Sequence, residues 1–211
     1  MIGSYGCGGS LISRIHILSA AHCAETCEND TGTLICTYKN INWATIGDHD
    51  KREPDGEIHV KIAKPYHVHP KARQPNPPRG AFTYDYAIFV LECCIEFNDY
   101  TQPVCLPEIA FRPKLINEFV ITVGWGDTKL DGDQSPILQF VEIKVLDDKE
   151  CEYIMEREQT TFKYDPIYLM CAGDPEDWDK DSCQNDSGGI FLVHNTSFKW
   201  SQILILIIES P

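Results

Sequence analysis

The sequence predicts an all-β protein, either a barrel or a sandwich. Short runs rich in β-branched and aromatic residues recur along the chain, and turn formers such as Glu53-Pro-Asp-Gly separate them. Alternating strand and helix units, which would indicate a parallel sheet, are not the pattern here. The runs that predict strands are 10–19, 41–46, 58–63, 86–91, 118–123, 138–145 and 189–193.

Three other segments complete the expected organisation. Residues 147–158 favour a helix, and because they open with two acids and carry few apolar side chains, this helix is expected on the surface. Residues 71–80 contain three prolines, which lack the N–H that a sheet requires, and predict an irregular surface loop. Residues 106–113 predict a connector between two halves of similar length.

Size and charge exclude several classes of protein. The 211 residues are 43% hydrophobic and 10% aromatic, which is enough for a sizeable core. Eighteen Lys and Arg against 32 Asp and Glu give a formal charge of −14, which disfavours binding to nucleic acid or to an anionic membrane. The longest apolar run, 203–208, is far shorter than the ~20 residues of a membrane-spanning helix.

Cysteine usage indicates an oxidising compartment. The ten cysteines are scattered instead of gathered in the paired spacing of a zinc ribbon, which favours disulfides. Glycosylation sequons at Asn29, Asn185 and Asn195 agree with secretion, and we expect glycans at Asn29 and Asn195. The first seven residues lack the features of a signal peptide, so either the signal lies upstream or the chain is not exported. The cysteines are Cys7, Cys23, Cys27, Cys36, Cys93, Cys94, Cys105, Cys151, Cys171 and Cys183.

Three motifs carry chemistry when they are taken together. They are Leu18-Ser-Ala-Ala-His22-Cys, Tyr84-Asp85-Tyr-Ala-Ile and Asp181-Ser-Cys-Gln-Asn-Asp-Ser187-Gly-Gly. A hydroxyl nucleophile needs a base to take its proton, and that base needs an acceptor to fix its tautomer. Each motif alone is more often structural, but His22, Asp85 and Ser187 in this order predict a catalytic triad.

With these motifs the sequence resembles the trypsin and chymotrypsin family of serine proteases. The resemblance runs from about Gly6 to Trp200 and includes Gly6-Cys-Gly-Gly-Ser-Leu-Ile, Gln102-Pro-Val-Cys-Leu-Pro and Gly124-Trp-Gly. It implies two antiparallel six-stranded β-barrels with the active site between them. Residues 1–107 would form the half that carries His22 and Asp85. Residues 108–211 would form the half that carries Ser187, and the two halves together would make one peptidase domain.

The resemblance also implies a role for each site residue. His22 would be the general base, Asp85 its orienting partner and Ser187 the nucleophile that forms an acyl-enzyme during endopeptidase hydrolysis. The backbone N–H groups of Asn185 and Ser187 would form the oxyanion hole, although the family has Gly where Asn185 stands. No cofactor is implied.

Asp181 predicts the specificity. It stands six residues before Ser187, where the family places the acid at the base of the primary pocket, and this implies cleavage after Lys or Arg. The alternative is a solvated acid in the acidic run 174–181. The expected partners are protein or peptide substrates with Lys or Arg, an activating protease and protein inhibitors, with no nucleic acid and no membrane.

Both ends of the chain depart from the family pattern. No activation motif supplies the Ile or Val amine that pairs, in the family, with the Asp at position 186, and after Trp200 no pocket wall, closing Cys or final helix can be assigned. The apolar tail could still form a barrel strand. A chain truncated at both ends explains these departures. Together with Asn185 they support an alternative: a catalytically weak or inactive homologue that acts as a protein-binding module. A third possibility is a fragment of a longer protease that does not fold stably.

The resemblance implies two disulfides, Cys7 with Cys23 and Cys151 with Cys171. Cys27 and Cys36 lie in an extra loop after His22 and could close a local pair. The remaining four cysteines, Cys93, Cys94, Cys105 and Cys183, have no assigned partner.

Two weaker patterns were weighed as metal sites. His67-Val-His69 could present two imidazoles, and the acidic loop formed by Asp48, Asp50, Asp55 and Glu57 lies where some relatives of the family hold Ca²⁺. Neither spacing fixes a coordination sphere, so no metal site is predicted.

Overall fold

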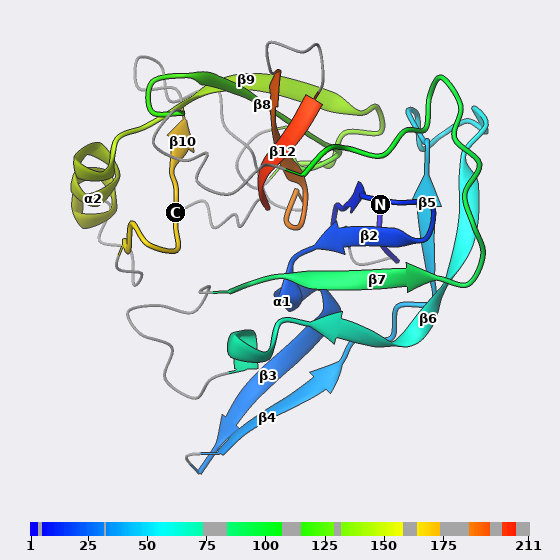
Figure 1. Ribbon diagram of the computed structural model, residues 1–211, viewed down its shortest axis with the longest axis horizontal. Helices are drawn as coiled ribbons and strands as arrows, with labels where there is room; N and C mark the ends of the chain where they lie inside the picture. The colour runs from blue at the N-terminus through cyan, green and yellow to red at the C-terminus, as the bar shows by residue number, and fades with distance from the viewer. Residues whose placement is uncertain are drawn as a thin grey trace.

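The computed structural model describes residues 1–3, 6–31, 33–73, 84–106, 115–128, 132–157, 164–173, 186–194 and 200–205. Over these residues the protein is built mainly from antiparallel strands, which form one sheet in each half and a separate hairpin (Figure 1). The all-β prediction is confirmed, and the two sheets are consistent with the two-barrel architecture that the resemblance implies, with five strands described in each sheet where the resemblance implies six. In the described part of the chain, no helix is both long and apolar enough to span a membrane.

The first half contains a five-stranded sheet in the order β1-β2-β7-β6-β5. Its strands are β1 (Ser10–Leu11), β2 (His16–Ser19), β5 (Trp43–Ile46), β6 (Ile58–Val68) and β7 (Ala87–Leu91). Buried residues alternate along β7, as expected for a strand with one face on a core, and Phe89 is fully buried. The core that these strands enclose includes Ile17, Val60, Ile62, Phe89 and Leu91.

The predicted strand 10–19 is two strands. Ser13 breaks it, because its Oγ accepts hydrogen bonds at 3.2 Å from the backbone N–H groups of Ile15 and His16. The chain therefore reverses, and Ser10 pairs with Leu18 across the resulting hairpin.

The second half contains a five-stranded sheet in the order β10-β9-β8-β11-β12. Its strands are β8 (Phe119–Gly124), β9 (Gln139–Val145), β10 (Ala172–Gly173), β11 (Ile190–His194) and β12 (Trp200–Ile205). Their core includes Val120, Ile143, Val145 and Phe191. The expectation that the tail forms a strand is confirmed for 200–205, which pair with β11.

The described residues include three helical segments. Two are α1 (Ala21–Ala24) and η1 (Pro70–Arg73), and the third is α2 (Asp148–Arg157), which matches the surface helix predicted over 147–158. Asp147 caps α2, since its Oδ1 accepts the N–H groups of Lys149 and Glu150 at 2.9 Å. Most of the predicted loop 71–80 and of the connector 106–113 lies outside the described residues.

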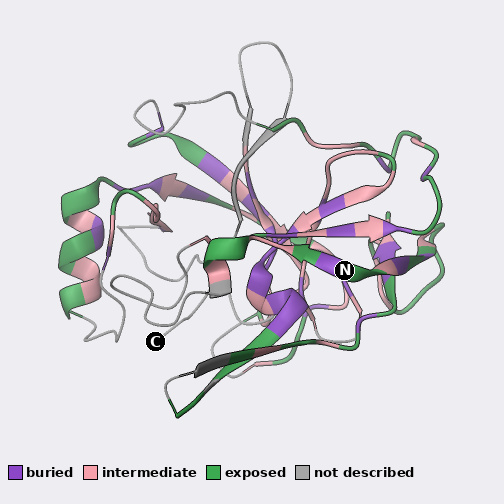
Figure 2. Cartoon of the chain, turned by 60° about the horizontal axis from the view of Figure 1, so that its bottom comes forward, coloured by how far each residue is buried: buried purple, intermediate pink, exposed green. Residues whose placement is uncertain are grey.

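A separate hairpin extends away from the body of the molecule directly after α1 (Figure 1). It consists of β3 (Glu25–Asp30) and β4 (Thr33–Tyr38), and its described side chains are mostly exposed (Figure 2). Cys27 lies opposite Cys36 in the register, and the two form a disulfide. The local pair expected inside the extra loop is therefore confirmed.

The other two expected disulfides, Cys7 with Cys23 and Cys151 with Cys171, are also formed. Among the described residues Cys93, Cys94 and Cys105 are exposed free thiols. Cys183 lies outside the described residues.

Candidate active site

His22 is carried by the short helix α1, which begins two residues after β2. The flanking residues Ala20, Ala21, Cys23 and Ala24 are small and buried, so this turn can lie deep in the first half while the histidine side chain keeps 32% of its surface exposed. The sheet register then brings the acid to the base. Ser19 at the end of β2 pairs with Ala87 at the start of β7, and Asp85 stands two residues before Ala87.

Asp85 uses both of its carboxylate oxygens on His22. Oδ1 accepts the backbone N–H of His22 at 2.8 Å, and Oδ2 lies 2.6 Å from Nδ1 of the ring. The carboxylate is nearly buried, with 5% of its side chain exposed, so this pairing takes place largely out of water. A carboxylate can only accept here, which assigns the proton to Nδ1 and leaves Nε2 of the neutral ring as an acceptor.

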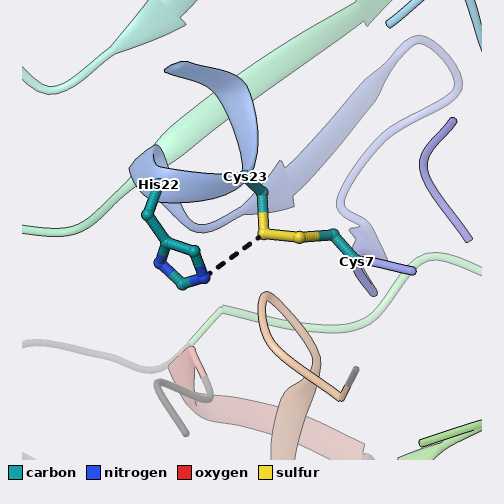
Figure 3. A group of neighbouring side chains, drawn as sticks. All are labelled: Cys7, His22 and Cys23. Carbon is teal, nitrogen blue, oxygen red and sulfur yellow. Dashed lines mark hydrogen bonds between the residues drawn. A yellow bond between two sulfur atoms is a disulfide. The ribbon is translucent and has the colours of Figure 1, made fainter. Parts of the chain in front are cut away.

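Nε2 of His22, the ring nitrogen that does not contact Asp85, faces a disulfide (Figure 3). Nε2 lies 3.7 Å from Sγ of Cys23, which is bonded to Cys7 at 2.03 Å. A disulfide sulfur has no proton to donate, so it does not compete with a hydroxyl for the lone pair of Nε2. When the ring of His22 is protonated, Sγ of Cys23 can instead accept a weak hydrogen bond from the Nε2 proton.

Ser187 reaches this site from the second half of the chain. Its carbonyl oxygen accepts the backbone N–H of Gly8 at 2.8 Å and lies 3.7 Å from Sγ of Cys23. The backbone of Ser187 and the ring of His22 therefore contact the same sulfur atom. The structure thus places the backbone of the predicted nucleophile close to the predicted base. The hydrogen bond from Gly8 to the carbonyl of Ser187 holds the two segments together.

The residue after the candidate nucleophile must be glycine. Gly188 has a φ of 77°, in the left-handed region, and a Cβ there would lie 2.4 Å from Oγ of Ser19 and 2.8 Å from the carbonyl oxygen of Gly8. Ser19 itself is fully buried, and its Oγ donates to that same carbonyl at 2.8 Å. Ser19 stands inside the motif Leu18-Ser-Ala-Ala-His22-Cys, but sequence reasoning gave it no role of its own.

Asp186 lies on the other side of Ser187 and packs against Gly124-Trp-Gly. Its Oδ1 accepts the backbone N–H of Gly126 at 2.7 Å, and a Cβ on either Gly124 or Gly126 would overlap the carboxylate. The glycines of Gly124-Trp-Gly, one of the motifs behind the family resemblance, are therefore required for steric reasons. They make room for the acid beside the nucleophile.

A pocket of about 170 Å³ adjoins Asp186, and both halves contribute to its lining. Lys51 enters from the first half with Nζ 5.9 Å from the centre of the Trp125 ring. Burial lowers the pKa of Lys51, and the negative charges of Asp48 and Asp186 oppose this shift.

Several predicted site residues lie outside the described part of the chain: Asp181, Cys183, Asn185 and Asn195. The oxyanion donor at Asn185 and the specificity acid at Asp181 therefore remain predictions. Asn29 lies on β3, opposite Leu34.

Asp50 and Asp55, two of the residues weighed as metal ligands, have other contacts. The guanidinium of Arg52 lies 2.6 Å from Asp50 and lowers the pKa of this partly exposed carboxyl to about 2. Asp55 accepts the backbone N–H groups of His49 and Asp50. Burial raises the pKa of Asp48, and the charges of Asp55 and Glu57 raise it further.

Only two groups of three candidate ligands come together over the described residues. They are Cys7 with His22 and Cys23, and Glu25 with Cys27 and Cys36. A disulfide occupies both sulfur atoms in each group, so neither group offers the thiolates that a metal would bind.

Two β-sheet halves, with a buried Asp paired to a partly exposed His beside a serine, define the class, a two-barrel protein of the serine protease type. The family model described as Trypsin matches residues 1–205, and the chain belongs to this family.

Known relatives agree with this assignment. The chain is 30% identical over 200 residues to Ovochymase-2 of Mus musculus, covering 92% of this chain and 29% of that protein. It is 33% identical over 190 residues to Venom serine protease Bi-VSP of Bombus ignitus, covering 89% and 48%. Serine protease snk of Drosophila melanogaster is 29% identical over 185 residues, covering 88% and 38%. The chain thus spans less than half the length of these relatives.

Proposed function

We propose that the chain is the catalytic domain of a secreted trypsin-like serine endopeptidase, with His22, Asp85 and Ser187 as its triad. The observation that carries the proposal is the double contact of Asp85 with His22, at 2.8 Å and 2.6 Å, beside the backbone of Ser187. This contact leaves Nε2 as the acceptor that a serine hydroxyl needs. Residues 1–107 and 108–211 act as two halves of one peptidase domain.

The proposed reaction is acyl transfer to Ser187. Nε2 of His22 takes the hydroxyl proton as Oγ attacks the peptide carbonyl, and Asp85 stabilises the imidazolium that forms. His22 then protonates the leaving amine, which leaves an acyl-enzyme on Ser187. Water, activated by the same histidine, hydrolyses this ester. The backbone N–H groups of Ser187 and Asn185 stabilise the oxyanion in both steps.

The proposed substrates are proteins cut after Lys or Arg, because Asp181 precedes Ser187 by six residues. A carboxylate at the base of a pocket selects a cationic side chain. Three disulfides and the sequons at Asn29 and Asn195 support secretion. An activating protease and protein inhibitors are the further partners we propose.

A second candidate is a protein-binding homologue with weak or no catalysis. Asn185 favours it, because the family has glycine at this position and an asparagine restricts the backbone that aims the oxyanion donor. Loss of one such donor costs on the order of 10²–10³ in rate.

Labelling with a fluorophosphonate probe separates the two candidates, because the probe reacts only with an activated serine. We expect the oxidised, folded chain to be labelled, and the Ser187→Ala and His22→Ala variants not to be labelled. A series of peptide substrates that differ only in Lys, Arg, Leu or Phe before the cut then tests Asp181, with Asp181→Ser as the matched variant.

The Asn185→Gly variant tests the oxyanion hole. If folded wild-type protein is not labelled and Asn185→Gly is, the chain is a homologue that lost activity at this one position. If neither is labelled, either before or after limited cleavage by a trypsin-type protease that stands in for the proposed activating protease, the protease proposal fails.

A further inference from the structure

The backbone beside Asp85 adopts an unfavourable conformation. Tyr84 has a φ of 61°, a left-handed value that a residue with a bulky side chain rarely adopts. The N–H of Tyr86 donates to the carbonyl of Tyr84 at 2.7 Å, which closes a three-residue turn centred on Asp85. The strained residue and the tight turn thus flank the acid that contacts His22.

This turn determines where the carboxylate points. Asp85 is buried and Tyr86 is 40% exposed, so the turn sends the acid inward and the next side chain outward just before β7 begins. An ordinary extended residue at position 84 would carry the chain into β7 without this turn. The contacts at 2.6 Å and 2.8 Å to His22 depend on it.

Side chains from two other segments hold the ring of Tyr84 in place. His69 stacks on it, with centroids 4.9 Å apart and planes 4° apart. Lys71 lies with Nζ 4.8 Å from the ring centre and donates to the hydroxyl at 3.3 Å. Tyr168, from the second half, packs a tilted ring at 5.0 Å. Hydrogen bonds from Tyr168 and Lys71 lower the pKa of Tyr84, as expected for an accepting hydroxyl.

We propose that Tyr84 is a positioning residue: its clamped ring maintains the strained turn that aims Asp85 at His22, and Tyr168 links this turn to the second half. Strain of this kind persists only where surrounding contacts over-determine it. The inference rests on the proposed triad for its catalytic meaning. The clamp itself is independent of any substrate.

Three substitutions of Tyr84 separate the effect of its ring contacts from the effect of its left-handed backbone conformation. Tyr84→Phe keeps the stacking and is expected to retain kcat within about threefold. Tyr84→Ala keeps the strain without the clamp, so kcat falls by about 10- to 100-fold with KM unchanged. Tyr84→Gly also lacks the clamp but adopts the left-handed turn freely, so its kcat lies above that of Tyr84→Ala. The acid limb of the kcat/KM profile moves to lower pH in Tyr84→Ala, because the imidazolium loses its partner.

A matched control is Asn117→Ala. Asn117 also has a left-handed φ, of 70°, but lies in the turn before β8. Its replacement is expected to lower Tm and leave kcat and the pH profile unchanged. If Tyr84→Ala behaves like this control, or if Tyr84→Gly is less active than Tyr84→Ala, the positioning role is refuted.

A proton NMR measurement keeps this inference separate from the proposed function. The Nδ1 proton between His22 and Asp85 should resonate far downfield in wild type and in Tyr84→Phe, and should be lost in Tyr84→Ala. If wild type shows this signal but fails to react with the fluorophosphonate, the protease proposal fails while the positioning role stands. If the signal is the same in Tyr84→Ala, the positioning role fails even in an active enzyme.

Discussion

Replacing Asp85 by asparagine tests the centre of the proposed mechanism. The backbone N–H of His22 must face an acceptor, so the asparagine amide oxygen takes the place of Oδ1 and its NH₂ takes the place of Oδ2, next to Nδ1. Nδ1 must then accept, and the ring proton moves to Nε2. The opposite amide orientation would set NH₂ against the backbone N–H and leave both donors unsatisfied, at a cost of about 1–3 kcal/mol per group. The substitution therefore produces a histidine that cannot take the serine proton.

We expect kcat to fall by on the order of 10⁴-fold, which corresponds to about 5 kcal/mol of transition-state stabilisation. The assay is hydrolysis of a Lys or Arg peptide ester, with the concentration of active sites fixed by fluorophosphonate titration of the wild type. Asp99→Asn, in an exposed loop, is the matched control and should be fully active. A folded Asp85→Asn protein with kcat within tenfold of wild type would refute the assignment of Asp85 and the tautomer argument with it.

Three further predictions concern stability. Because the pKa of Asp48 is raised in the folded state, its contribution to the free energy of unfolding is fully present below the ordinary value of 3.8 and is lost as pH rises through the folded-state pKa. Asp48→Asn should therefore raise Tm at pH 7 and leave Tm nearly unchanged at pH 3.5 in thermal scans. Gly188→Ala should lower the free energy of unfolding in urea by more than about 2 kcal/mol, because its Cβ would clash with neighbouring atoms. Gly56 has open space around it, so Gly56→Ala should lower the same free energy only by the left-handed penalty of about 1–2 kcal/mol. Equal losses in the two variants would contradict the clash at Gly188. Replacing Cys27 and Cys36 by serine should speed proteolytic cleavage within residues 25–38 while kcat stays within about twofold, and unchanged cleavage would show that the strands hold without the crosslink.

The features that could be predicted from the sequence are those that depend on a local pattern of residues. The seven strand runs, the helix over 147–158 and the motifs around His22, Asp85 and Ser187 each carry their signal within a few neighbouring residues. The β3–β4 hairpin was predicted only as a loop with a cysteine pair. Its first strand, Glu25-Thr-Cys-Glu-Asn-Asp, has weak β-propensity and no apolar alternation.

The contacts that could not be predicted from the sequence join segments that are far apart in the chain. Nothing near Tyr84 marks a left-handed turn, since tyrosine disfavours that conformation, and its clamp comes from His69 and Tyr168. The same holds for the hydrogen bond from Gly8 to the carbonyl of Ser187, which two backbone groups make without any side-chain signal.

The disulfide between Cys7 and Cys23 has a consequence for handling the protein. One of its sulfur atoms touches both the ring of His22 and the carbonyl of Ser187, so this crosslink is a wall of the site as well as a link in the fold. Two separated thiols would be bulkier than the bonded pair and would add S–H donors beside the base. Protein made in a reducing cytosol, even if compact, would therefore carry a different site from protein folded under oxidation, and the redox history of a sample belongs with any report of its activity.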